Sequence, residues 1–360
     1  MKAAVCYDFG RPLVVEELDI DPPQVGEIKV DVAACAICHS DIYSVRGEWG
    51  GEPPIVAGHE VAGTVSELGA GVTAVRPGER VVVSLLRSCG SCFFCSIGRP
   101  YNCEGEFALR RETRLHAKDG TPVAQGVYTG GFAEQVVVDQ SQVVKIPSEE
   151  IPFDSASLLA CGVATGVGAV TNTADVAFGS SVVVVGIGGV GINCVQGAAL
   201  SGAATIIAVD ILDSKLDAAR RFGATHTINA REQEPGPAVL ELTGGRGADY
   251  AFAATGSSKV ISQILDMVRK GGVAVVVGMP PNEDVEFTIN AHTLTWDRTL
   301  KGSFMGSTCL AVDVPRLAEL YLRGRLKLDE LITGRYPLER INEAIESVER
   351  GEALRNVIVF

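Results

Sequence analysis

The chain is poor in aromatic side chains, histidine and positive charge, and the shortage of positive charge excludes one class of partner. Aromatic residues make up 6% of the 360 residues, while His occurs 5 times and Met 4 times. Lys and Arg (31) are outnumbered by Asp and Glu (44), so the formal net charge is −13, and no long Lys/Arg run is present. Such a chain is a poor match to a phosphate backbone, and we therefore exclude nucleic acid as a partner.

Charge is missing altogether from two long stretches, residues 155–174 and 176–209, which a hydropathy window would flag as membrane spans. Their flanking charges include Asp154 and Asp175, whereas cytoplasmic ends of spans usually carry Lys or Arg. A buried parallel strand followed by a buried helix gives the same uncharged pattern. The opening MKAAVCYDFGRP has no apolar run long enough for a signal peptide. We expect a cytoplasmic protein without a membrane partner.

The length suffices for about two domains, and the pattern of expected strands and helices changes near residue 160. Before that point, short Val-rich runs are separated by Gly, Pro and Asp, which is typical of a small β-rich barrel or sandwich. The expected strands there are 27–32, 61–68, 80–84, 133–138 and 142–146.

After that point, strands and helices alternate, which predicts a doubly wound parallel sheet of the α/β class. The expected strands are 182–185, 205–210, 225–229, 249–253 and 272–278, and the expected helices are 189–201, 213–222 and 259–268. Two further helices are expected at about 315–323 and 341–350, with a final strand at 357–360. The segment 299–310 is a candidate edge strand for pairing between subunits.

A glycine-rich turn follows the strand at 182–185 and matches G-x-G-x-x-G through Gly186, Gly188 and Gly191. These glycines permit a tight turn, a close approach of a pyrophosphate to the backbone, and close packing of helix on strand. Asp210 ends the next strand and can accept hydrogen bonds from ribose hydroxyls, while it repels a 2′-phosphate. The sequence therefore predicts a dinucleotide site that favours NAD over NADP.

Ten cysteines are many for a chain with no sign of secretion, and metal binding is the first explanation. Cys89, Cys92, Cys95 and Cys103 have the spacing of four thiolates that close around a tetrahedral structural zinc. An iron–sulfur cluster or two disulfides are the alternatives. Elsewhere Cys38, His59 and Cys161 make up a Cys2His set, which leaves a fourth zinc position open for water or substrate.

With these motifs, the chain resembles the zinc-dependent medium-chain alcohol dehydrogenase family over essentially its whole length. The turn GHE at 58–60, the four-cysteine lobe, CGVATG at 161–166, the glycine fingerprint and KGS at 301–303 occur in the family's order. The resemblance implies a β-rich GroES-like catalytic domain over 1–161 and 305–360. It also implies a Rossmann domain over 162–304 and a homodimer or homotetramer.

The resemblance also assigns roles to single residues. Cys38, His59 and Cys161 would hold the catalytic zinc, with Asp41 orienting His59 and Glu60 behind the metal. Thr165 would touch the nicotinamide, Lys215 would lie near the adenosine ribose, and His39 and Arg355 would face the pyrophosphate. The full set of expected cofactor contacts is His39, Thr165, Gly186, Gly188, Gly189, Val190, Gly191, Asp210, Lys215, Val277 and Arg355.

The implied reaction interconverts a primary alcohol and its aldehyde by hydride transfer to NAD. Ser40 is the candidate for the first step of proton removal. Many relatives carry a histidine three residues beyond this position as the final base, and this chain has Tyr43. By position, four apolar side chains would line the substrate pocket and favour an apolar or aromatic tail: Trp49, Leu85, Met279 and Phe304.

Other functions stay open at this stage. A polyol dehydrogenase is disfavoured, because its members commonly carry a carboxylate at the position of Cys161. A glutathione- or mycothiol-dependent formaldehyde dehydrogenase is favoured by the basic loop 108–118, which holds Arg110, Arg111, Arg114 and Lys118. A non-catalytic protein that binds NAD and zinc is the alternative from another class.

Overall fold

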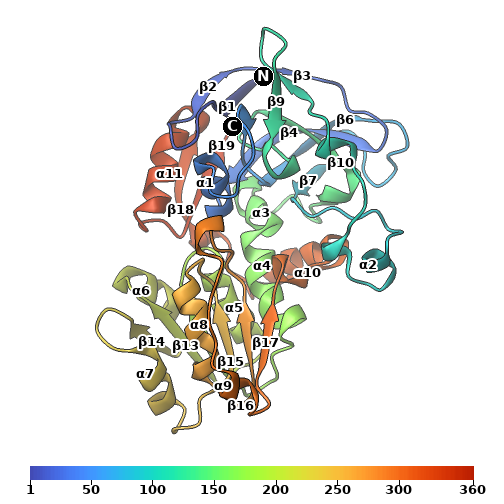
Figure 1. The fold of residues 1–360 in the computed structure, drawn as a ribbon. Coiled ribbons are helices and arrows are strands. Elements are labelled where there is room, and N and C mark those ends of the chain that lie inside the picture. The colour runs from blue at the N-terminus through green and yellow to red at the C-terminus, as the bar shows by residue number, and fades with distance from the viewer. The chain divides into compact units, whose positions relative to one another are not determined.

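The computed structural model describes all 360 residues, which separate into two compact units (Figure 1). The first unit comprises residues 1–161 and 309–360, and the second comprises residues 162–308. The chain returns to the first unit at Cys309, where the sequence indicated about residue 305. No single helix is long and apolar enough to cross a membrane. Only the consecutive short helices Phe153–Ala160 and Gly162–Thr173 pass that test, and only when taken together.

Two sheets form most of the first unit, and the expectation of a β-rich first part is confirmed. The strands are β1 (Lys2–Cys6), β2 (Val14–Glu17), β3 (Asp19–Ile20), β4 (Glu27–Ala36), β5 (Ile55–Val56), β6 (Glu60–Leu68), β7 (Arg80–Val83), β8 (Leu115–His116), β9 (Pro122–Gln125), β10 (Gln135–Asp139), β11 (Val143–Lys145), β18 (Ile332–Pro337) and β19 (Arg355–Val359). One sheet has the order β2-β1-β5-β9-β8-β3, and the other has the order β11-β7-β6-β4-β19-β18, with β10 on β4.

Helices of the first unit are few and mostly short. They are α1 (His39–Arg46), α2 (Phe93–Ser96), α3 (Phe153–Ser157), α10 (Leu310–Leu322) and α11 (Ile341–Glu349). The last strand, β19, pairs antiparallel with β4, so both ends of the chain lie in this unit (Figure 1). Val5, Ile28, Val61 and Val81 are fully buried in its core, as β-branched side chains of paired strands commonly are.

The second unit is a six-stranded parallel sheet with helices, which confirms the doubly wound α/β prediction. Its strands are β12 (Ser181–Val185), β13 (Thr205–Asp210), β14 (His226–Asn229), β15 (Ala248–Ala253), β16 (Val268–Val276) and β17 (Thr299–Gly302). Its helices are α4 (Gly162–Gly168), α5 (Gly191–Leu200), α6 (Asp213–Arg221), α7 (Pro235–Leu242), α8 (Ser258–Met267) and α9 (Ala291–Leu294). The order β14-β13-β12-β15-β16-β17 reverses direction beside β12, where such sheets bind ligands.

The structure corrects two boundaries and adds helices to the prediction. Helix α10 begins at Leu310 and contains Pro315, so the expected start at about residue 315 is wrong. Its first turn is closed by bonds from the Val312 and Asp313 amides to the Cys309 carbonyl, before the proline is reached. The edge strand in 299–310 covers only Thr299–Gly302, because Met305 and Ser307 take positive φ values of 48° and 51°. In the second unit, the prediction missed α4, α7 and α9.

Candidate active site

Four side chains that can bind a metal converge inside the first unit. The ligand atoms of Cys38, His59, Glu60 and Cys161 all lie within 4.8 Å of one another, and all four residues are buried. Cys38 directly precedes α1, His59 directly precedes β6, and Cys161 follows a short helix at Leu158–Ala160. The structure thus brings together the three residues of the expected Cys2His set and adds the Glu60 carboxylate to them.

Asp41 holds this group from behind. Its carboxylate accepts a hydrogen bond of 2.7 Å from His59 Nδ1, and it also accepts the amide N–H groups of Gly58 (2.9 Å) and Cys38 (3.0 Å). The last bond closes the first turn of α1, so the same carboxylate caps the helix and orients the imidazole. Asp41 is 1% exposed. The His59 ring is therefore fixed by local backbone geometry.

The other ring nitrogen of His59 indicates what the cluster binds. His59 Nε2 is buried and has no hydrogen-bond partner in the protein, although buried polar atoms are normally satisfied. With Nδ1 bonded to Asp41, the free nitrogen presents its lone pair to the two thiols, which is the arrangement of a metal-binding histidine. Two thiols and one imidazole nitrogen are ligands that zinc prefers. The residues present fit a zinc ion.

Glu60 has a partner that the sequence analysis did not find. Arg355, on β19, places Nη2 2.5 Å from Glu60 Oε1, and both side chains are almost fully buried. Burial raises the pKa of Glu60 to about 7, and the positive charge of Arg355 opposes that shift. The expected role of Arg355 toward a pyrophosphate stays a prediction. In the first unit, Arg355 neutralises the carboxylate beside the metal ligands.

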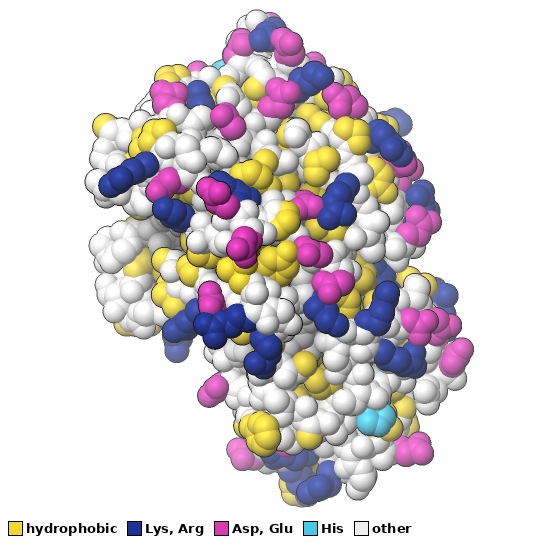
Figure 2. Space-filling model, turned by 180° about the vertical axis from the view of Figure 1, so that it is seen from behind, with side chains coloured by type: hydrophobic (Ala, Val, Ile, Leu, Met, Phe, Trp, Pro, Cys, Tyr) yellow, Lys and Arg dark blue, Asp and Glu magenta, His cyan; other side chains and the backbone are white.

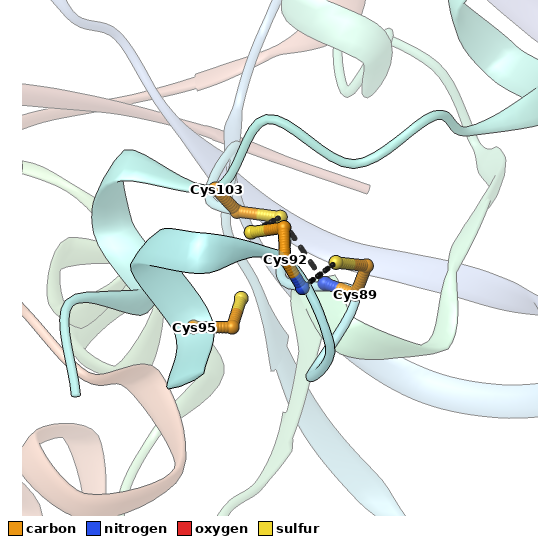
Figure 3. Close-up of side chains that lie close together, drawn as sticks. All are labelled: Cys89, Cys92, Cys95 and Cys103. Atoms are coloured by element: carbon orange, nitrogen blue, oxygen red, sulfur yellow. Dashed lines mark hydrogen bonds between the residues drawn. The ribbon is translucent and has the colours of Figure 1, made fainter. Parts of the chain in front are cut away.

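The second cluster lies in the lobe around α2. The sulfur atoms of Cys89, Cys92, Cys95 and Cys103 all lie within 4.8 Å of one another, and all four cysteines are free (Figure 3). The Cys92 and Cys103 sulfurs are 3.8 Å apart. That separation suits two ligands of a tetrahedral zinc, because Zn–S bonds of about 2.3 Å place the sulfurs about 3.8 Å apart.

Backbone amides support the thiolates of this lobe. The Cys89 and Gly105 amides point at the Cys103 sulfur (3.2 and 3.3 Å), and the Cys92 amide points at the Cys89 sulfur (3.3 Å). Figure 3 shows two of these bonds, with Cys95 approaching from the end of α2. Amide hydrogens directed at sulfur stabilise thiolates and so suit a metal site. The four sulfurs leave no position for a substrate, so the cluster is of the closed, structural type.

In the second unit, β12 runs into the glycine turn that was expected to bind a dinucleotide. Gly186 has a φ of 88°, and a Cβ at Gly191 would lie 1.8 Å from the Gly186 carbonyl oxygen. Neither position accepts another residue without a shift of the backbone. A Cβ at Gly188 would meet nothing within 4 Å, so the turn is open at that point. Helix α5 begins at Gly191 and directs its N-terminus toward the turn.

Asp210, at the end of β13, ties this turn to the next strand. Its carboxylate accepts the Ile187 amide (2.7 Å) and the amides of Ile211 (2.7 Å) and Leu212 (3.1 Å). Lys215 is buried nearby on α6, and burial lowers its pKa while the charge of Asp210 opposes the shift. Gly189 and Val190 complete the turn, and Val277 is buried just after β16. Their contacts with a cofactor remain predictions.

Thr165 also has a neighbour that the sequence did not reveal. Its hydroxyl donates to the Met305 sulfur at 3.5 Å, and both side chains are buried in the second unit. The four expected pocket residues divide between the units. Trp49 and Leu85 are partly buried in the first, whereas Met279 and Phe304 are exposed to 51% and 45% in the second. A pocket formed by all four stays a prediction.

The residues around Ser40 form an aromatic group on the first unit. Tyr43 lies one turn beyond His39, and their rings meet edge to face with centroids 5.4 Å apart. The Trp49 ring centroid also lies 5.4 Å from that of Tyr43. Burial raises the pKa of Tyr43 above the ordinary value of a phenol, so the side chain is neutral near pH 7. Tyr43 is therefore unsuited to accept the final proton.

The basic loop at 108–118 is less basic than its sequence indicates. Arg114 is 2% exposed and forms two bonds to the Glu27 carboxylate, at 2.9 and 2.7 Å. It also pairs with Glu112, while Arg111 pairs with Glu106 and Lys118 with Asp19. The idea that Arg114 is a solvated or ligand-binding charge is wrong, because the buried carboxylate of Glu27 already neutralises it. Only Arg110 among the four has no ion pair.

We expect Arg114→Met to lower the free energy of unfolding by about 3–5 kcal/mol, because the change leaves the Glu27 carboxylate buried and unpaired. Urea unfolding followed by circular dichroism measures this loss. Arg111→Met is the matched control, since its ion pair with Glu106 is exposed and such pairs contribute less than about 1 kcal/mol. Equal effects of the two substitutions would contradict the buried role of Arg114.

The surface carries no large field of one charge on the face seen in Figure 2, where acidic and basic side chains alternate with apolar ones. This distribution agrees with the absence of a long basic run in the sequence. It offers no continuous basic path for a nucleic acid on that face.

Two family models match the chain. "Alcohol dehydrogenase GroES-like domain" covers residues 24–148, and "Zinc-binding dehydrogenase" covers residues 189–323. The NDMA-dependent alcohol dehydrogenase of Amycolatopsis methanolica is 38% identical over 99% of this chain and 98% of its own length. The chain belongs to the zinc-containing medium-chain alcohol dehydrogenases. This alcohol dehydrogenase is therefore a zinc-dependent enzyme with a GroES-like first domain.

Two further relatives of this alcohol dehydrogenase differ in the substrate that their names give. The S-(hydroxymethyl)glutathione dehydrogenase of Paracoccus denitrificans is 35% identical over 100% of the chain and 99% of its own length. The benzyl alcohol dehydrogenase of Acinetobacter calcoaceticus is a solved structure, with a TM-score of 0.92 and 31% identity, over 100% of this chain and 99% of that one. The family fixes the two zinc sites and the class of reaction.

Proposed function

We propose that this enzyme interconverts primary alcohols that carry an apolar or aromatic tail and their aldehydes, with NAD as the hydride acceptor. The observation that carries the proposal is the buried cluster of Cys38, His59 and Cys161, with His59 Nε2 left without a protein partner. Three such ligands hold zinc and leave one position for a substrate oxygen. When bound, zinc supplies Lewis-acid chemistry and NAD supplies the acceptor for hydride.

The protein's own residues then orient the site and move the proton. Asp41 keeps the His59 imidazole in one tautomer and one orientation through the 2.7 Å bond to Nδ1. Ser40, in the first turn of α1, is two residues from Cys38, and we assign to its hydroxyl the first acceptance of the alcohol proton. The neutral phenol of Tyr43 cannot end this route, so the proton leaves through solvent or through another base.

The first unit is accordingly the catalytic zinc domain of the proposal, and the second is the domain that binds the dinucleotide. The open Gly186–Gly191 turn, the N-terminus of α5 and the Asp210 carboxylate support NAD as the cofactor. Because one relative is named for its dependence on NDMA, the assay of this enzyme includes NDMA beside free NAD.

Two observations weigh on the choice of substrate. Arg114, the one buried cation of the basic loop, is already paired with Glu27, so it is unavailable to the acid groups of a thiol cofactor. The similarity to a benzyl alcohol dehydrogenase supports an aromatic alcohol. Membership of an enzyme family also disfavours the non-catalytic alternative.

A rate comparison tests the proposal. The purified zinc enzyme is assayed with benzyl alcohol, hexan-1-ol, sorbitol and S-(hydroxymethyl)glutathione, each with NAD alone and with NAD plus NDMA. We expect kcat/KM for the first two alcohols to exceed the others by at least about tenfold, since an apolar tail contributes roughly 0.8 kcal/mol per buried CH2 group. A preference for the thiol adduct or the polyol would overturn the substrate class.

Asp210→Asn should narrow the preference for NAD over NADP by about tenfold or more, because it removes a charge that repels the 2′-phosphate. The asparagine retains an oxygen that can accept the Ile187 amide, so the glycine turn keeps its support. Steady-state KM values for both cofactors measure the change. Asp217→Asn is the control, since Asp217 is exposed on α6, the helix that follows β13, and pairs with Arg220. An unchanged ratio in Asp210→Asn would exclude Asp210 from the ribose site.

A further inference from the structure

Arg87 is a half-buried cation that neither the metal sites nor the cofactor site uses. It lies between the end of β7 and the first cysteine of the structural lobe. Its guanidinium carbon is 3.7 Å from the ring centroid of Tyr128 and 4.8 Å from that of Phe107. Nη1 is fully buried and has no hydrogen-bond partner. The aromatic rings hold the guanidinium plane in place and leave a donor of the group unused.

The surroundings of Arg87 lack the carboxylate that a buried cation normally pairs with. Tyr128 and Asp139 attract the guanidinium, whereas Arg110 repels it. Neither Arg87 nor Arg110 forms an ion pair, whereas Arg114 is held by two bonds to Glu27. Cation–π contacts offset only part of the cost of burying a cation. An anion is the missing partner.

We propose that Arg87 binds a carboxylate group carried by the alcohol or aldehyde substrate. A planar guanidinium offers parallel N–H donors that match the two oxygens of a carboxylate. The single charge of a carboxylate also balances the single charge of the half-buried guanidinium. Arg110, on the loop at 108–118, adds positive charge near Arg87. This inference rests on the proposed function and narrows it to alcohols that bear an acid group on the apolar or aromatic tail.

Hydrogen bonds connect the walls of this site to a metal ligand. The Gln142 amide donates to the carbonyl oxygens of Ser84 (2.8 Å) and Tyr128 (3.4 Å). The Ser84 hydroxyl donates to the Ala160 carbonyl at 2.6 Å, and Ala160 directly precedes Cys161. Arg87 follows Ser84 by three residues. The strand end that carries Arg87 and the backbone that carries Cys161 are thus held in one buried network of the first unit.

A pair of matched substrates tests the assignment. Benzyl alcohol and 4-(hydroxymethyl)benzoate differ only in the carboxylate, so the ratio of their kcat/KM values isolates its contribution. We expect Arg87→Met to lower kcat/KM for 4-(hydroxymethyl)benzoate by about tenfold to a hundredfold, because a hydrogen-bonded charge pair contributes that much to binding. The kcat/KM for benzyl alcohol should change by less than about twofold. Arg87→Lys keeps the positive charge but loses the paired N–H donors of the guanidinium. Its kcat/KM for the acid should therefore lie between those of the wild type and Arg87→Met.

Controls make the result specific. Arg111→Gln removes an exposed arginine that is paired with Glu106, and it should leave kcat/KM for both substrates unchanged. If Arg87→Met does not fold, as circular dichroism would show, the Arg87→Lys variant carries the comparison. Equal losses for both substrates would show that Arg87 only supports the lobe and would overturn the proposal.

Direct binding separates this inference from the proposed function. Calorimetric titration of benzoate into the zinc-loaded enzyme should show binding to the wild type that weakens at least about tenfold in Arg87→Met. If no alcohol is oxidised and benzoate still binds through Arg87, the proposed function fails and the anion site stands. If benzoate binds through Arg87 and the acid substrate is not preferred, the carboxylate belongs to a separate ligand and the assignment to the substrate is overturned. Equal benzoate binding by both proteins overturns the site itself.

Discussion

Replacing Cys161 by alanine is expected to remove one of the two zinc ions per chain and to lower kcat for alcohol oxidation by at least about a thousandfold. The metal contributes several kcal/mol of charge stabilisation, and each 1.4 kcal/mol is a factor of about ten in rate. Cys161 supplies one of only three Cys and His ligands in the buried cluster, so its loss leaves Cys38 and His59 to hold the ion.

Metal analysis and steady-state kinetics on the same preparation check this expectation. Cys194→Ala is the matched control, because Cys194 is a fully buried thiol on α5 that lies outside both clusters. The control should keep two zinc ions and nearly full activity, apart from a small loss of stability from the removed sulfur. Two zinc ions in Cys161→Ala, with activity within tenfold of the wild type, would exclude Cys161 as a ligand.

The sheet of the second unit was readable from the sequence because its strands are short aliphatic runs bounded by charged or glycine residues. The strand Thr205–Asp210 was predicted with its observed bounds, and the glycine turn at 186–191 was recognised from its context. Local signals of this kind need no knowledge of the rest of the chain. The same holds for the lobe cysteines, whose spacing alone indicates a closed site.

Contacts between distant segments were not readable in the same way. The pairs Glu60–Arg355 and Glu27–Arg114 join residues far apart in the sequence, and no local pattern indicates that either pair forms. Burial and pairing arise only when β19 enters the sheet beside β4 and when Arg114, just before β8, meets Glu27 at the start of β4. The unpaired Arg87 is a signal of the same kind, because only the fold shows which arginine lacks a carboxylate.

Loss of the structural cluster should have the opposite signature to loss of the catalytic one. Cys103→Ser removes a sulfur that lies 3.8 Å from the Cys92 sulfur and accepts two backbone amides. We expect one zinc ion per chain and a Tm lower by roughly 10 °C, since a structural zinc contributes directly to folding free energy. Exposed bonds in the lobe at 89–107 should become sensitive to proteolysis, because the ion is what joins its two ends.

Calorimetry, zinc analysis and limited proteolysis measure these effects. Ser96→Ala is the control on the same lobe, because the Ser96 hydroxyl makes only a 3.4 Å bond to a backbone carbonyl. The two cysteine variants then distinguish the effect of losing the catalytic zinc from the effect of losing the structural zinc. Cys161→Ala should lose activity while its lobe stays resistant to protease. Cys103→Ser should lose stability in the lobe while the folded fraction retains the metal at Cys38, His59 and Cys161. Loss of both ions from either single variant would show that the two sites are coupled and not independent.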